Sequence, residues 1–119
     1  MTAALRHQYY LAADLAPLWS TDDPKVTQVA QGSASAGEHV IFQVRWQADA
    51  VQACRYRMQG CDYFIAAVVY LAEWLVGRTS QQCADFSAET LSAHFDMPAH
   101  KQHVVQVIVA VIEALSAIQ

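Results

Sequence analysis

The stretch QACRYRMQGCDYFIAA, residues 52–67, changes its hydrophobic period at a glycine and a cysteine. Before Gly60, apolar residues alternate with arginines, and this period of two predicts a strand with one apolar side. After Gly60, apolar residues recur at intervals of three and four, which predicts a helix. The alternating apolar positions are Cys54, Tyr56 and Met58, and the helical ones are Phe64, Ala67, Val68, Leu71 and Leu75. The chain is therefore expected to pass from strand to helix at Cys61.

Two further strands are expected upstream of this junction. HVIFQVRWQ, residues 39–47, again alternates, and the short connection ADAV leads directly into the next strand, so the two form an antiparallel hairpin. KVTQVAQGSASAGE, residues 25–38, begins as a β-prone segment and ends in small residues. The sheet is therefore expected to span about residues 25–59.

Helical patterns flank the sheet on both sides. An N-terminal helix is predicted over about 3–16, and the remainder, about 62–118, reads as helical. Gly77 suits the position after a helix end, Ser87 suits an N-cap, and Pro98 precedes the final helix. No βαβ alternation demands a parallel sheet. We expect one domain, residues 1–119, of the α+β class, with a small antiparallel three-stranded sheet and helices packed on one face.

Composition narrows the class of protein. The net charge of −4 lacks the basic excess that nucleic acid binding requires. The apolar run near the C-terminus is interrupted by Gln106 and Glu113, so no membrane span is expected. Three cysteines at wide spacing, without a leader pattern, favour a reduced cytoplasmic protein. A hydrophobic content of 55% favours some apolar surface that faces a partner, and leaves a homo-oligomer open.

Cys61 is the strongest candidate for chemistry because a thiol at a helix N-terminus meets unpaired N–H groups. Glu38 opens a strand, while His100 and His103 lie three apart on the final helix. If these elements meet, sulfur, imidazole and carboxylate form a ligand set suited to zinc or iron. The alternative is that these histidines are ordinary solvated or capping residues. Cys54 and Cys83 match no metal or disulfide spacing.

Three quoted segments carry a resemblance to the IscU/NifU N-terminal type of iron–sulfur cluster assembly scaffold, over about residues 25–118. They are GEHVIFQVRW, CRYRMQGCDYFIAA with LAEWLVG, and MPAHKQHV. The matching positions are Gly37, Gln43, Arg55, Gly60, Cys61, Ile65, Ala66, Glu73, Trp74, Gly77, Pro98, Lys101 and His103. The resemblance implies the α+β sandwich described above.

The departures from the family pattern fall on its ligands. The family carries three cysteines and an aspartate around its site, and here these positions read Ala36, Cys61, Val104 and Glu38 respectively. The resemblance implies a reduced ligand set of Cys61, Glu38 and His103, with His100 as a candidate fourth ligand, and Gly37 and Lys101 beside the site. A [2Fe–2S] cluster usually takes four protein ligands, mostly thiolates. We therefore favour mononuclear zinc or iron over a cluster.

The resemblance implies a scaffold-like protein that binds iron, zinc or a transient cluster, and that is not itself an enzyme. The alternative is a pseudo-scaffold, an interaction or regulatory partner of a cysteine desulfurase without cluster chemistry. The family's recognition segment for an Hsp70-type chaperone lacks its second proline here, at Ala99, which argues against chaperone docking. No phosphate loop, nucleophile elbow or zinc-protease motif occurs.

Overall fold

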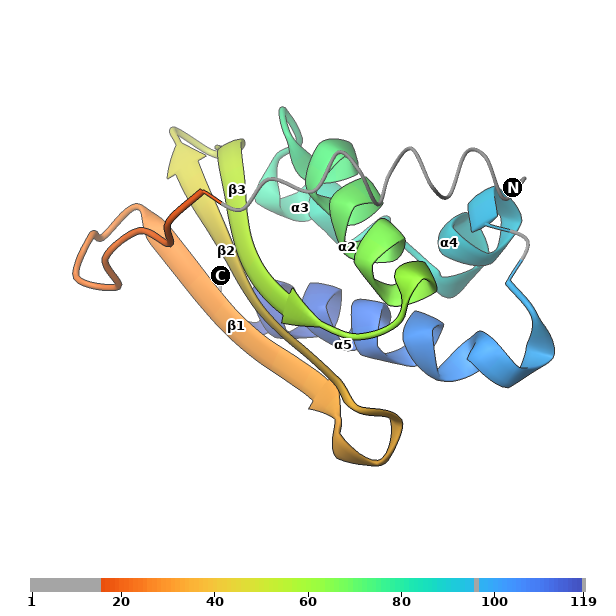
Figure 1. Ribbon diagram of the computed structural model, residues 1–119. Helices are drawn as coiled ribbons and strands as arrows, with labels where there is room; N and C mark the ends of the chain where they lie inside the picture. The colour runs from red at the N-terminus through yellow and green to blue at the C-terminus, as the bar shows by residue number, and fades with distance from the viewer. Residues whose placement is uncertain (1–15, 96, 119) are drawn as a thin grey trace.

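The fold of this computed structural model, described for residues 16–95 and 97–118, is a sheet with helices on one face (Figure 1). The elements follow in the order β1 (Val26–Ser33), β2 (Glu38–Gln47), β3 (Ala50–Gln59), α2 (Asp62–Leu75), α3 (Ser80–Cys83), α4 (Ala88–Phe95) and α5 (Gln102–Ile118). The predicted α+β class is confirmed. The N-terminal helix expected over about 3–16 lies almost entirely outside the described residues.

The three strands are antiparallel in the order β1-β2-β3, as the alternating patterns predict. Phe42 at the centre of β2 stands opposite Val29 of β1 and Tyr56 of β3. This register places Val40, Phe42 and Val44 on one side of the central strand, where all are fully buried. Their burial requires that a layer of helices cover this side.

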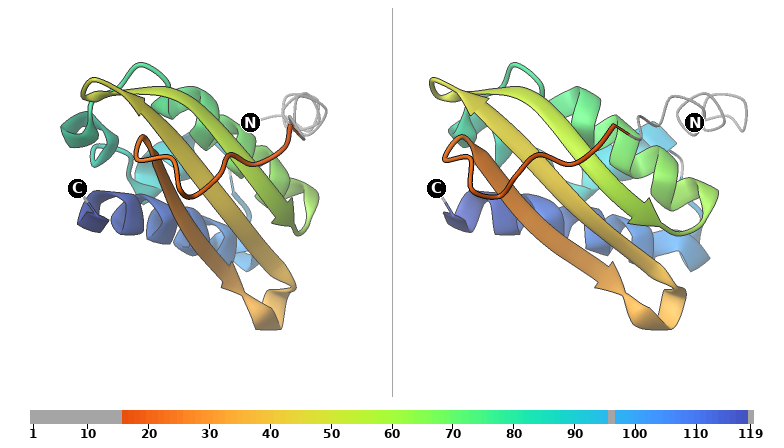
Figure 2. Two further views of the ribbon diagram at one scale, coloured as in Figure 1. Left: turned by 90° about the vertical axis from the view of Figure 1, so that its left-hand side faces the viewer. Right: turned by 60° about the vertical axis from the view of Figure 1, so that its left-hand side comes forward.

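Helices α2 and α5 supply most of that layer, and both lie on the same side of the sheet (Figure 2). α2 packs against β3 and α5 against β1, so the two helices flank the buried side of β2. Their buried side chains recur at helical spacing; among them are Phe64, Val68 and Leu71 in α2 and Val104, Ile108 and Val111 in α5. The change of hydrophobic period after Gly60 therefore marks the point where the chain leaves the sheet and enters the layer of helices.

The predicted helix boundaries are largely confirmed. Gly77, with φ of +89°, follows the end of α2. The Ser87 hydroxyl accepts a hydrogen bond from the Thr90 backbone N–H, as expected of an N-cap at the start of α4. The final helix begins later than Pro98, because a 3₁₀ turn, Ala99–Lys101, stands between that proline and α5.

A segment before β1, residues 16–19, crosses the other face of the sheet, and we term it the strap (Figure 2). Gln43, which is fully buried, accepts from the Trp19 N–H at 2.8 Å and donates to the Trp19 carbonyl at 2.9 Å. Arg55 donates to the Pro17 carbonyl and Arg57 to the Ala16 carbonyl. The arginines on the polar side of β3 thus hold this backbone segment against the sheet.

Gln43→Ala should therefore lower the free energy of unfolding by about 1–3 kcal/mol, because both backbone groups of Trp19 lose their partner in a half-buried position. Urea unfolding followed by Trp fluorescence measures the change. Gln47→Ala, an exposed position on the same strand, is the matched control and should change stability by less than about 0.5 kcal/mol. Equal effects of the two substitutions would contradict the structural role of Gln43.

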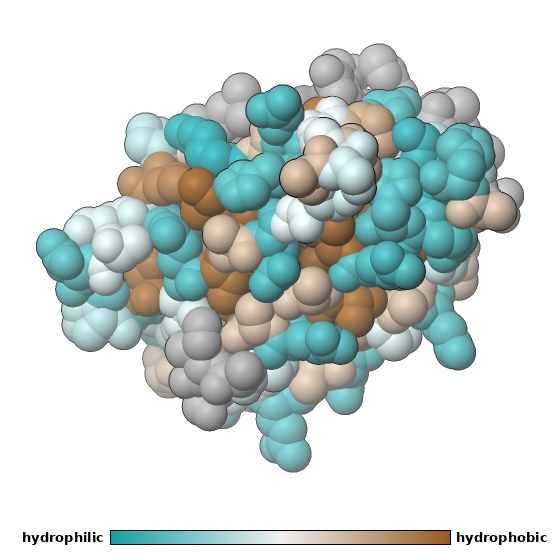
Figure 3. Space-filling model, turned by 90° about the horizontal axis from the view of Figure 1, so that it is seen from below, coloured by the Kyte–Doolittle hydropathy of each residue, from teal (hydrophilic) through white to brown (hydrophobic). Residues whose placement is uncertain are grey.

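Few large apolar side chains are exposed among the described residues. Val76, which is 51% exposed, is the single exposed large hydrophobic side chain in residues 16–95 and 97–116. Seen from below, brown residues are broken up by teal and pale ones (Figure 3). Most of the apolar excess therefore lies in or against the core, and the apolar surface that faces a partner stays a prediction. No helix in the described ranges is long and apolar enough to cross a membrane.

Candidate metal centre

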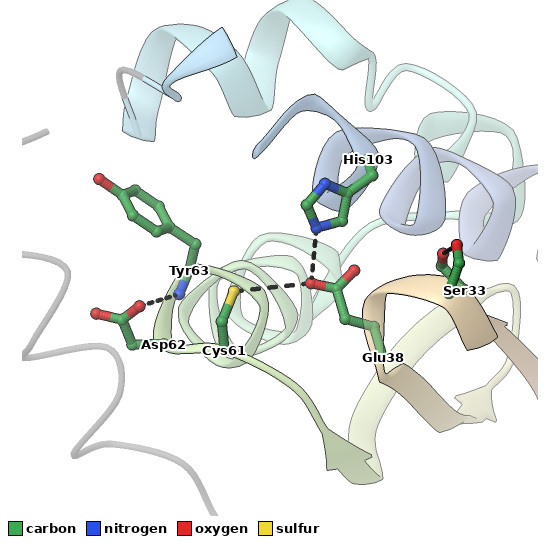
Figure 4. Close-up of polar contacts among 7 residues, drawn as sticks. Ser33, Glu38, Cys61, Asp62, Tyr63 and His103 are labelled. Atoms are coloured by element: carbon green, nitrogen blue, oxygen red, sulfur yellow. Dashed lines mark hydrogen bonds and ion pairs between the residues drawn. The ribbon is translucent and has the colours of Figure 1, made fainter. Parts of the chain in front are cut away.

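The three side chains that the sequence singles out meet at one end of the molecule (Figure 4). Glu38 is the first residue of β2, Cys61 is the N-cap of α2, and His103 lies in the first turn of α5. Each element thus contributes one side chain from its beginning. The meeting point is where the sheet, α2 and α5 adjoin.

The Glu38 carboxylate is the centre of this group. Its Oε2 atom accepts from the Cys61 thiol at 3.7 Å and lies 3.1 Å from His103 Nε2. The Glu38 side chain is only 1% exposed, whereas that of His103 is 32% exposed. Because Glu38 is a carboxylate removed from water, its contacts with the thiol and imidazole replace part of its lost hydration.

The second oxygen of the same carboxylate is not satisfied. Glu38 Oε1 is buried and has no hydrogen-bond partner among the described residues. A buried acceptor without a partner costs on the order of 1–3 kcal/mol. A buried acceptor without a partner, placed among titratable groups, is typical of a binding site. There a ligand supplies the missing hydrogen-bond partner.

Two glycines permit this position of Glu38. Gly37 has φ of +69°, a left-handed conformation that reverses the chain just before β2. Gly60 lies against the site, since a Cβ there would stand 3.2 Å from Glu38 Cγ and 2.6 Å from the Phe64 ring. Sequence reasoning identifies Gly60 as a family position but misses this contact, because Glu38 and Gly60 are far apart along the chain.

The three donor atoms are of types that a divalent ion accepts, and the distances between them partly match those of a zinc site. Neighbouring ligands of a tetrahedral zinc ion stand roughly 3.3–3.8 Å apart, given metal–ligand bonds of about 2.0–2.3 Å. The Oε2–Sγ separation of 3.7 Å and the Oε2–Nε2 separation of 3.1 Å lie in or near this range. Within residues 16–95 and 97–118, however, no group of three or more His, Cys, Asp or Glu is arranged to hold a metal ion. Binding therefore requires a side-chain adjustment around Glu38.

The other predicted site residues are placed differently. His100 is exposed in the 3₁₀ turn before α5, and no hydrogen bond or ion pair among the described residues joins it to the three side chains. Lys101, in the same turn, is half-buried. At the lost cysteine positions, Ala36 is exposed and Val104 is fully buried.

Of the remaining two cysteines, Cys83 belongs to the core and Cys54 packs against it, partly buried. Burial raises the pKa of the Cys54 thiol to about 12, with a smaller contribution from Cys83. Burial also raises the pKa of Cys83, although Arg78 opposes the shift. Cys83 is the last residue of α3, and its side chain is only 3% exposed although Gln81 and Gln82 beside it are exposed. The raised pKa values of the two thiols disfavour thiolates at both positions, which leaves Cys61 as the site thiol.

Comparison with known proteins agrees with this fold. The profile of the family described as "NifU-like N terminal domain" matches residues 17–119. The iron-sulfur cluster assembly protein IscU of Plasmodium falciparum is 26% identical over 72 residues, which are 60% of this chain and 44% of the length of that relative.

Two solved structures are similar in fold. The first is a cluster assembly scaffold protein assigned to the SUF system of Fervidobacterium islandicum AW-1, with a TM-score of 0.75 at 12% identity over 94% of this chain and 93% of the other. The second is the N-terminal part of a NifU-like protein of Brucella abortus, with a TM-score of 0.56 at 16% identity over 95% and 80%. At these identities the likeness concerns the fold alone.

Proposed function

Because the chain belongs to the family of NifU-like N-terminal domains, we propose that it binds iron(II) or zinc at Cys61, His103 and Glu38 as a divergent iron–sulfur cluster assembly scaffold. Metal is the cargo of such a protein. The observation that carries the proposal is the buried Glu38 carboxylate, which contacts both the thiol and the imidazole through Oε2 while Oε1 has no partner.

The ligand chemistry favours a single ion over a cluster. One thiolate, one imidazole and one carboxylate suit zinc or iron(II), with water as the remaining ligand. A [2Fe–2S] cluster usually needs four protein ligands and favours thiolates. Here the one thiol at the site is Cys61, since Cys83 is buried in the core and Cys54 lies on β3, where burial raises the pKa of its thiol. A transient cluster would need donors from outside the described site.

Each residue would contribute differently to binding. Cys61 binds metal as a thiolate, so the proton now directed at Glu38 is released on binding. Glu38 is fixed by its burial, so it serves as the rigid ligand. The half-exposed imidazole of His103 is the group with room to turn from the carboxylate toward an ion.

Protein purified without added metal, then titrated anaerobically with zinc or iron(II), should bind about one ion per chain. Cys61→Ser should weaken the affinity at least tenfold, because serine replaces a soft thiolate with a weakly acidic hydroxyl. Metal analysis and competition with a chelator measure both quantities. Cys54→Ala is the matched control and should bind like the parent, because Cys54 lies on β3 with its pKa raised by burial.

Two results would contradict the proposed metal binding at Cys61, His103 and Glu38. One is the absence of bound metal in the parent protein under anaerobic conditions. The other is equal affinity in Cys61→Ser and Cys54→Ala, which would place any bound metal elsewhere.

The second candidate function is a pseudo-scaffold that interacts with or regulates a cysteine desulfurase. The observation that favours it is Val104, which fills a fully buried position where the family has its last cysteine. Co-purification with a cysteine desulfurase discriminates the two functions. Binding that survives Cys61→Ser and metal removal favours the pseudo-scaffold, while loss of binding under both conditions favours the metal-binding scaffold.

Three lesser features belong to the same proposal. The three cysteines are free, which suits a reducing compartment such as the cytoplasm. Ala99 at the place of the family's second proline lacks a fixed φ, so docking of an Hsp70-type chaperone is not part of the proposed function. We assign the protein no catalytic turnover of its own.

A further inference from the structure

Strand β1 forms one edge of the sheet, and its hydrogen-bonding pattern decides which backbone groups face outward. The Trp46 N–H donates to the Lys25 carbonyl at 2.8 Å. Partners in an antiparallel pair alternate between bonded and non-bonded, so Gln28, Ala30 and Gly32 direct their N–H and C=O groups away from β2. Asp23 accepts the outward N–H of Val26.

The outward groups of Gln28, Ala30 and Gly32 have no backbone partner within residues 16–95 and 97–118. The whole strand, VTQVAQGS, contains no charged residue and no proline. Natural edge strands usually carry such residues, because they prevent another chain from pairing with the edge. β1 therefore lacks the charged residues and prolines that commonly prevent strand addition.

Helix α5 packs on β1 and reaches past its free edge (Figure 2). Between the two elements lies a groove of about 280 Å³, whose walls include Gln31 and Ser33 from β1 and His103, Gln106 and Ala110 from α5. The groove contains no Lys, Arg, Asp or Glu. An added strand would therefore have backbone partners on β1 and uncharged space for side chains against α5.

We infer that the outward edge of β1 and this groove form a docking site for an extended, uncharged segment of a partner polypeptide, which adds to the sheet as a further strand. Backbone hydrogen bonds to Gln28, Ala30 and Gly32 supply affinity, and every second side chain of the segment enters the groove. An uncharged segment fits best because the walls of the groove hold no Lys, Arg, Asp or Glu, and His103 already contacts the Glu38 carboxylate.

The position of α5 selects a single segment over a second copy of this chain. If two β1 edges paired around a two-fold axis, the two α5 helices would meet across that axis, because each reaches past its own edge. A single extended segment has no such obstacle. It would lie beside His103, so a docked partner would border the candidate metal centre.

A phage-displayed library of random octapeptides, selected against the metal-free full chain, tests the inference. The selected peptides should be uncharged and rich in β-branched residues, and synthetic copies should bind in fluorescence polarisation. Ala30→Pro should weaken this binding at least tenfold, because it removes an outward N–H that an edge position does not need for folding. Ala30→Thr keeps the N–H and should bind like the parent.

A second pair of variants tests the helix wall without altering β1. Ala110→Glu places a charge in the groove and should also weaken binding at least tenfold, whereas Ala110→Ser should not. Failure to enrich any peptide, or equal binding by Ala110→Glu and Ala110→Ser, would overturn the inference. So would a dimer in sedimentation velocity that dissociates on Ala30→Pro substitution, since the edge would then be occupied by a second copy.

Discussion

Replacing Glu38 with leucine should raise the free energy of unfolding of the metal-free protein by about 1–3 kcal/mol and lower its affinity for zinc at least tenfold. The substitution is thus expected to stabilise the fold while it weakens metal binding. A residue retained only for structure would give a loss of stability instead. The combination is therefore a signature of a carboxylate retained for binding.

The gain in stability follows from burial. Glu38 is a carboxylate with a 1% exposed side chain, and its Oε1 atom has no partner. Replacing such a group with an apolar side chain of similar size is often neutral or stabilising. The groups left behind lose little, because His103 is exposed enough to bond to water and the thiol of Cys61 is a weak donor.

Urea unfolding in the presence of a chelator and zinc competition titration measure the two effects. Glu38→Gln separates charge from shape, since the amide retains the size of the side chain but is a poorer metal ligand than a carboxylate. Glu113→Leu, on the exposed side of α5, controls for the general effect of replacing a glutamate with leucine. If Glu38→Leu unfolds more easily and binds zinc normally, Glu38 is a structural residue and the proposed centre is wrong.

The sheet and the two long helices were open to prediction because each has a single hydrophobic period. In β2 the alternation of Val40, Phe42 and Val44 identifies the buried side before any contact is known. The same reasoning fails for Arg55 and Arg57. Period two separates the sides of a strand, but it does not say what lies on the polar side, and here a backbone segment from before β1 lies there.

The sequence predicts which side chains form the candidate centre, but not how their atoms are arranged. Cys61, Glu38 and His103 are each marked by position at the start of an element, and these starts meet. His100 was misplaced because a spacing of three assumes one continuous helix. The 3₁₀ turn Ala99–Lys101 precedes α5, so His100 lies outside that helix and is exposed. The orphan oxygen of Glu38 has no sequence signal, because it depends on packing from three separate elements.

Restoring the two family cysteines should convert the centre from a mononuclear site to a cluster site. Anaerobic reconstitution of Ala36→Cys/Val104→Cys with iron and sulfide should yield about two iron and two sulfide ions per chain and visible charge-transfer absorption. The parent chain should bind iron without sulfide under the same conditions. The physical reason is the ligand count, since the double variant adds two thiolates to Cys61 and His103.

Cysteine at position 36 and cysteine at position 104 should lower the stability of the fold by different amounts. Ala36 is exposed, so a cysteine there needs no repacking. Val104 is fully buried, and the smaller cysteine leaves a gap that should cost about 1 kcal/mol. Ala36→Cys/Val105→Cys is the matched control, because Val105 is also buried but lies one residue further along α5 and therefore points in another direction.

The comparison between the two double variants separates the two candidate functions. Cluster formation in Ala36→Cys/Val104→Cys alone means that the backbone still holds a scaffold site and that only its ligands have changed. If neither variant holds sulfide although both fold, Val104 has become part of the core. Restoring the thiol then does not restore the site, and the pseudo-scaffold is the better account. If both hold a cluster equally, the added thiolates act without positional requirement and the assignment of Val104 to the lost ligand position is wrong.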